Sequence, residues 1–263
     1  MMVRLLIGII AIFLCFPITQ VTAADSKPYE KLNDLLETSI QLSRQERYVE
    51  AHNLLEIFMD DFSKMMTTQK NVKMDDVRVI MSVHSQTKDI LMNGTVPHEE
   101  KVRNVMMLRL AVDAMSSEHQ PLWTEMEEPI ITTFQQLKHS VESKDENIFG
   151  QHYYRLIKTY NLILPSLRMD VKPEYIAKVD AHLQYLDQNK RTIIQDPSKM
   201  DQLNAMETDF RALFEQLKED ETDPSLLWVM ISTGSIILLT LSYVAWRRYE
   251  AENRKRKRKK QKD

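Results

Sequence analysis

The stretch from Glu46 to Met66 reads ERYVEAHNLLEIFMDDFSKMM and decides the fold class. Its apolar residues recur at intervals of three and four, which places them on one face of an α-helix. The same spacing from Ser26 to Arg44 predicts a preceding helix, and the short break between the two predicts an antiparallel helical hairpin. The predicted inner face of the second helix consists of Tyr48, Ala51, Leu54, Leu55, Phe58, Met59 and Phe62.

The rest of the chain also has the composition of a helical protein. Only 4 of the 263 residues are Gly, where ordinary usage near ~7% would give about 18. This scarcity argues against a β-sandwich, a barrel or a nucleotide fold with Gly-rich loops. We therefore expect an all-α bundle of helical hairpins. Further helices are predicted at Asp75–Leu91, Pro97–Ser117, Pro121–Glu142 with a bend at Pro129, Asp145–Pro165, Pro173–Leu186 and Pro197–Leu217.

A repeat architecture is the alternative to a plain bundle. The segment Arg47–Leu55 resembles half of a tetratricopeptide-type repeat, in which a small residue allows close helix contact. Ile148-Phe149-Gly150 occupies a comparable place in the second predicted hairpin. Two hairpins so far apart do not make an array with a period of about 34 residues, so the plain bundle is favoured over a tetratricopeptide-like fold.

The first of two long apolar runs, Leu5–Ile18, indicates a signal sequence. It follows Arg4 and leads into the small residues of Val21–Ala24, which predicts a signal peptide over residues 1-23 with cleavage after Ala23 or Ala24. An uncleaved N-terminal anchor is the alternative. Cleavage would remove Cys15, the only cysteine, and would exclude disulfides, Cys-ligated zinc and a thiol nucleophile.

The second run, Ser225–Trp246, predicts one transmembrane helix over residues 225-246. It reads SLLWVMISTGSIILLTLSYVAW, carries no charge, and would span roughly 33 Å as a helix. Aromatic rings near its two ends and the bases that follow are typical of the membrane–water interface. The predicted interface residues are Trp228, Tyr243, Trp246, Arg247 and Arg248.

Charge predicts the orientation of that helix. Residues 247–263 carry ten bases and three acids, a net charge of +7, although the whole chain carries −3. Because basic flanks stay in the cytoplasm, we expect a basic cytoplasmic tail at 247-263 and an acidic, extracytoplasmic α-helical domain at 24-224, in a single-pass protein of the cell membrane with its N-terminus outside. The expected partner of the tail is the lipid bilayer, not nucleic acid.

No motif predicts a catalytic, cofactor-binding or metal-binding residue, and no cofactor is expected. His98-Glu99 begins like a zinc-protease motif, but Val102 stands where the second His ligand belongs. The acids Glu118, Glu125, Glu127 and Glu128, around His119 and Trp123, could hold a cation or serve as a general acid, although a solvated acidic face is the favoured interpretation. The candidates for a partner surface are Trp123, Tyr153, Tyr154 and Arg155.

The whole pattern resembles the sporulation protein YpjB family of endospore-forming bacilli. The resemblance rests on the signal sequence, the acidic helical body, the late apolar span and the terminal run RKRKRKK at 254–260, and it is most recognisable at Tyr48–Ala51 and Trp228–Trp246. It implies a membrane protein connected with sporulation. It transfers no site residues.

Two functions are compatible with these features. The favoured hypothesis is a membrane-anchored helical interaction module that binds an envelope protein or a wall component without catalysis. The alternative is an extracytoplasmic enzyme that acts on the cell wall through paired carboxylates. A deep cleft with convergent acids would distinguish the enzyme from the module.

Overall fold

The computed structural model describes residues 26–69, 72–117, 120–220 and 224–259. These residues are helical and contain no strand, which confirms the all-α prediction. The predicted signal peptide at 1-23 lies outside them. The body divides into two compact units. Unit 1 contains the described residues up to Trp123 together with Asn161–Met169, and the second unit contains Thr124–Tyr160 and the residues from Asp170 onward. We call the part of the second unit that ends at Asp220 unit 2.

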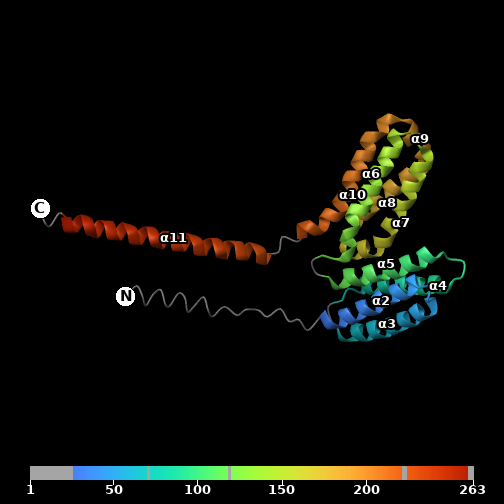
Figure 1. Cartoon of the computed structure of the whole chain (residues 1–263), viewed down its shortest axis with the longest axis horizontal. Coiled ribbons are helices and arrows are strands. Elements are labelled where there is room, and N and C mark those ends of the chain that lie inside the picture. The colour runs from blue at the N-terminus through green and yellow to red at the C-terminus, as the bar shows by residue number, and fades with distance from the viewer. Residues whose placement is uncertain (1–25, 70–71, 118–119, 221–223, 260–263) are drawn as a thin grey trace. The chain divides into compact units, whose positions relative to one another are not determined.

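Unit 1 is a bundle of four helices in two hairpins. They are α2 (Ser26–Arg44), α3 (Tyr48–Thr68), α4 (Met74–Met92) and α5 (His98–Ser116), which Figure 1 shows packed together. Helix α2 contacts both α3 and α5, and α4 contacts the same two helices. This closed arrangement is that of a bundle, since the repeats of a tetratricopeptide array contact only their neighbours.

The core of unit 1 uses the helix face that the sequence predicted. Leu55 and Phe58 are fully buried, and the rings of Phe58 and Phe62 stack with their centroids 5.8 Å apart. Tyr48, Leu54 and Met59 of the predicted face are half-buried at its margins. Burying one Leu or Phe side chain contributes about 1.5–3 kcal/mol, so this face supplies much of the packing free energy of α3.

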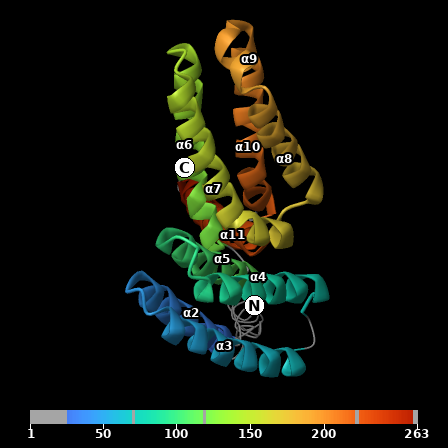
Figure 2. The same ribbon diagram turned by 90° about the vertical axis from the view of Figure 1, so that its right-hand side faces the viewer.

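Unit 2 also contains two helical hairpins, and short helices lie between some of its longer ones. Figures 1 and 2 show α6, α8 and α10 running along one another, and the rings of Phe134 and Phe210 pack between α6 and α10 with centroids 5.2 Å apart. Its elements, of which η1 and α7 belong partly to unit 1, are η1 (Leu122–Met126), α6 (Glu127–Glu142), α7 (Glu146–Asp170), α8 (Pro173–Gln188), α9 (Lys190–Gln195), η2 (Pro197–Lys199) and α10 (Met200–Asp220).

The first hairpins of the two units turn in the same way. After α2, Glu46 adopts a left-handed conformation with φ 62°, and the amide of Arg47 donates to the Leu42 carbonyl at 2.9 Å. After α6, Lys144 has φ 55° and the amide of Asp145 donates to the Ser140 carbonyl at 3.0 Å. Both turns have the hydrogen bonding of a Schellman motif, with a side chain where Gly is usual.

The predicted helix start at Pro121, the bend at Pro129 and the helix end at Pro165 were wrong. The helix predicted from Pro121 starts at Glu127, after the 3₁₀ turn η1. Pro129 therefore lies in the first turn, where an amide has no helical partner to lose, and requires no bend. Helix α7 continues through Pro165 to Asp170, since an interior Pro removes one hydrogen bond without ending every helix. The short helix α9 was not predicted.

One long helix, α11 (Pro224–Lys259), follows the two units in the chain. Its segment Val229–Tyr249 is long and apolar enough to cross a membrane, and no part of it is buried against the rest of the described chain. This is consistent with the predicted single span at 225-246, displaced by a few residues. The helix also continues without a break into the basic tail.

Helix α4 carries three exposed methionines on one face. Met74, Met81 and Met92 are 65%, 54% and 53% exposed. Their spacings of seven and eleven residues bring them to the same side of an α-helix. We call them the α4 methionine face.

Candidate functional site

The predicted partner surface is only partly exposed. Trp123 is fully buried, so the prediction that it lies on this surface was wrong. A ring as large as indole gains most free energy when it is removed from water. The burial of Trp123 therefore gives it a packing role.

Tyr153 links α7 to α8. Its side chain is half-buried, and its hydroxyl donates to the Leu183 carbonyl at 3.2 Å. Burial, with a smaller effect of the Asp187 carboxylate, raises the pKa of Tyr153 to about 12, so the hydroxyl keeps its proton and remains a donor. This contact assigns a structural role to Tyr153.

Tyr154 is the exposed aromatic residue of the predicted surface. It is 59% exposed, and Lys158 Nζ lies 4.2 Å from the centre of its ring in a cation–π contact. Arg155, also exposed, donates from Nη1 to Gln136 Oε1 at 3.5 Å. We call Tyr154, Arg155 and Lys158 the Tyr154 surface. It offers an aromatic face and two bases to a partner.

The predicted acidic cluster is only partly described. Glu118 and His119 lie outside the described residues, whereas Glu125, Glu127 and Glu128 lie in η1 and the first turn of α6. Within the described ranges, no three His, Cys, Asp or Glu side chains are grouped to hold a metal ion.

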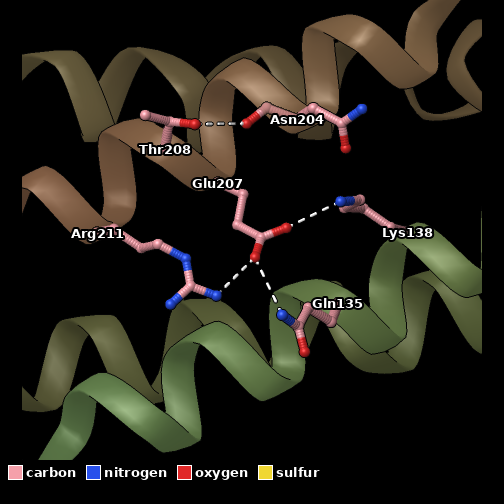
Figure 3. A network of polar contacts seen from close by, with 6 residues as sticks. All are labelled: Gln135, Lys138, Asn204, Glu207, Thr208 and Arg211. Atoms are coloured by element: carbon pink, nitrogen blue, oxygen red, sulfur yellow. Dashed lines mark hydrogen bonds and ion pairs between the residues drawn. The ribbon is translucent and has the colours of Figure 1, made fainter.

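The most elaborate polar cluster surrounds Glu207 of α10 (Figure 3). Its carboxylate, 13% exposed, accepts hydrogen bonds from Lys138 Nζ at 2.8 Å, Gln135 Nε2 at 3.0 Å and Arg211 Nη2 at 2.8 Å. Burial alone would raise the pKa of Glu207, but these donors outweigh it and lower the pKa to about 2. A carboxylate held ionised by three donors joins α10 to α6.

Asp209 joins the same helix to α8. It accepts hydrogen bonds from Lys178 Nζ at 2.6 Å and His182 Nε2 at 2.7 Å. Burial opposes ionisation, yet the two donors hold the pKa of Asp209 below its usual range. The Glu207 and Asp209 carboxylates of α10 are therefore both engaged in bonds between helices.

A pocket that sequence analysis missed lies in unit 1. It has a volume of about 340 Å³, and the polar residues among those that line it are Arg44, His98, Glu99 and Arg103. Its apolar lining is formed by Val102, Met106 and Leu162. These residues come from α2, α5 and the part of α7 that belongs to unit 1.

Contacts from Tyr48 position His98 beside this pocket. The Tyr48 hydroxyl lies 2.8 Å from His98 Nδ1, and Lys101 Nζ lies 4.1 Å from the centre of the Tyr48 ring. His98 and Lys101 are one turn apart on α5, so the start of α5 contacts the Tyr48 side chain from two positions. Arg44 and Arg103 are two of the many bases of the body, and their spacing in the sequence gave no reason to group them.

The predicted membrane-interface residues lie on α11. Tyr243, Trp246, Arg247 and Arg248 are exposed on this helix. The side chain of Trp228 lies outside the described part of the structure, although its backbone is helical. Aromatic rings directly before a pair of bases are typical of the edge of a bilayer.

Comparison with known proteins gives two matches. The family described as "Sporulation protein YpjB (SpoYpjB)" matches residues 29–258. The chain is also 32% identical over 239 residues to the Bacillus subtilis (strain 168) protein named "Uncharacterized protein YpjB", covering 90% of each chain. No solved structure matches.

Proposed function

Since this chain belongs to the sporulation protein YpjB family, we propose that it is a single-pass, membrane-anchored helical interaction module associated with sporulation. In this proposal α11 spans the cell membrane, and units 1 and 2 lie outside the cytoplasm. There they bind an envelope protein or a wall component, and they carry out no catalysis.

The observation that carries the proposal is the exposed apolar helix α11. Its segment Val229–Tyr249 has no buried part, whereas the helices of units 1 and 2 bury their own cores. An apolar surface of this length is unfavourable in water and favourable in a bilayer, whose hydrocarbon core needs about 20 residues of helix.

The flanks of α11 support the orientation. Arg247 and Arg248 follow the apolar segment, and the basic run 254–260 comes soon after. Glu219, Asp220, Glu221 and Asp223 precede it. Because Lys and Arg next to a span favour the cytoplasmic side, the C-terminal tail lies inside the cell in this proposal.

The Tyr154 surface supports binding to a partner. Tyr154 is exposed and Arg155 lies next to it, and Tyr and Arg are two of the residue types enriched at the energetic centres of protein interfaces. An acidic surface with an apolar residue would complement it.

Site-specific photocrosslinking in sporulating cells tests this role. A photoreactive amino acid replaces Tyr154 in the full-length chain, and a matched variant carries it at Asp60, which is exposed on α3. We expect a discrete crosslinked band from position 154 during sporulation and none from position 60. Equal crosslinking from both positions, or none from 154, would contradict the assignment of the partner surface.

A further inference from the structure

The pocket of unit 1 has an unusual balance of charge. Among the described residues, neither Arg44 nor Arg103 forms an ion pair, whereas Arg47, Arg78 and Arg109 each pair with an acid. Glu99 is the single acid among the residues that line the pocket. Two arginines without an ion pair therefore line one pocket on a body whose overall charge is negative.

His98 adds a third donor to the two guanidinium groups. When the Tyr48 hydroxyl donates to His98 Nδ1, the proton of the neutral ring lies on Nε2, which is then a donor. His98 and Glu99 also belong to the first turn of α5, where the positive end of the helix dipole favours an anion. Apart from Glu99, the polar residues that line the pocket thus carry groups that attract negative charge.

The remaining residues that line the pocket are apolar. Val102 and Leu162 are buried, and Met106 is half-buried. A volume of about 340 Å³ is within the range of small-molecule sites. A small inorganic anion would leave this surface uncovered, whereas an anion attached to an apolar group would cover it.

We propose that this pocket binds an organic anion, in which a carboxylate or phosphate group is attached to a short apolar chain. The anionic group lies between Arg44, Arg103 and His98, since a guanidinium fork matches the oxygens of either group. The apolar chain lies against Val102, Met106 and Leu162. This ligand site is separate from the Tyr154 surface, and the inference does not depend on the proposed function.

Methyl NMR of the full-length chain in a neutral detergent tests the proposal. Methionine methyls are labelled, and the Met106 signal is followed while butyrate or butyl phosphate is added. Butanol and butylamine serve as controls for partition into the detergent, and acetate and inorganic phosphate as controls for the apolar chain. We expect a saturable shift of Met106 with at least one of the two organic anions and none with butanol or butylamine. The tighter of the two identifies the preferred anionic group.

Substitution of both arginines completes the test. The double variant Arg44→Gln with Arg103→Gln should bind the organic anion at least about tenfold more weakly, because it loses the charge-assisted hydrogen bonds. Arg78→Gln, which changes an exposed arginine of α4, should bind normally. Far-UV circular dichroism verifies that each variant is folded. The proposal is overturned by equal affinity in the double variant, by an equal response to butanol, or by inorganic phosphate or acetate binding as tightly as the butyl compounds.

Discussion

Glu207 couples the stability of unit 2 to pH. Its pKa is about 2 in the folded chain, so the folded state loses the benefit of the ionised carboxylate as the pH falls from about 4.5 toward 2. Glu207→Gln should lower the free energy of unfolding at pH 7 by about 1–2 kcal/mol, since it leaves Lys138 and Arg211 without their acceptor charge. The variant should also lose part of the acid sensitivity. Urea unfolding at pH 7 and pH 3.5 measures both effects.

Glu215→Gln, an exposed change on the same helix, is the control and should shift the free energy of unfolding by less than about 0.5 kcal/mol.

His84 couples the stability of unit 1 to pH in a different way, because burial favours its uncharged form whereas Glu207 is held ionised. It is buried, stacks on Phe58, and donates from Nε2 to the Leu55 carbonyl at 2.9 Å. Burial lowers the pKa of His84, and the bond to Leu55 only partly opposes that effect. As the pH falls below about 6.5, the unfolded chain takes up a proton that the folded chain resists, so stability is lost.

His84→Gln should therefore reduce the loss of stability between pH 7.5 and pH 5.5, because Gln keeps a donor but does not titrate. Part of the loss should persist, since burial also lowers the pKa of His152. Urea unfolding of the full-length chain in neutral detergent at the two pH values is the measurement. An unchanged difference between them would show that His84 does not govern this dependence.

At the scale of elements, the α2–α3 hairpin depends on the inner face of α3. Leu55 is fully buried, so Leu55→Asp would place a carboxylate in the core without a partner, at a cost on the order of 4 kcal/mol. Ile57 is exposed on the same helix, and Ile57→Asp is the matched control. We expect loss of cooperative unfolding of unit 1 in the first variant and nearly normal unfolding in the second, by circular dichroism. Similar unfolding of the two variants would contradict the assigned face.

The helices were predictable because their apolar residues repeat at intervals of three and four. That local pattern correctly placed α2 from Ser26 to Arg44 and the buried face of α3. The end of α7 was not predictable in this way, because whether Pro165 ends a helix depends on its packing. The two left-handed turn residues, Glu46 and Lys144, also escaped prediction because a Glu or Lys in the sequence does not signal that conformation.

At the scale of the whole molecule, the acidic flank before α11 and the basic flank after it predict the topology. Protease added to intact protoplasts should degrade residues 24–224 and spare a C-terminal tag, because the bases from Arg247 onward hold the tail inside. An immunoblot for the tag measures this. Protoplasts permeabilised with detergent should lose the tag as well. Protection of the body in intact protoplasts would reverse the assigned orientation.

The candidate sites were less predictable than the helices, because each is assembled across separate segments. The pocket combines Arg44, His98, Arg103 and Leu162, whose positions in the chain share no period. The spacing of residues also carries no information on whether a particular ring is covered, so Trp123 and Tyr154 looked equivalent although one is buried and the other exposed. Only the packed helices distinguish them.

The α4 methionine face has a consequence for damage by oxidants. Thioethers on a surface are converted to sulfoxides, whereas buried ones are shielded. Met74, Met81 and Met92 should therefore be oxidised before Met65 and Met206, which lie in the cores of the two units. A sulfoxide on this face disturbs no core packing, and reductases can restore the thioether. Oxidation of these three methionines should thus leave the bundle beneath helix α4 intact.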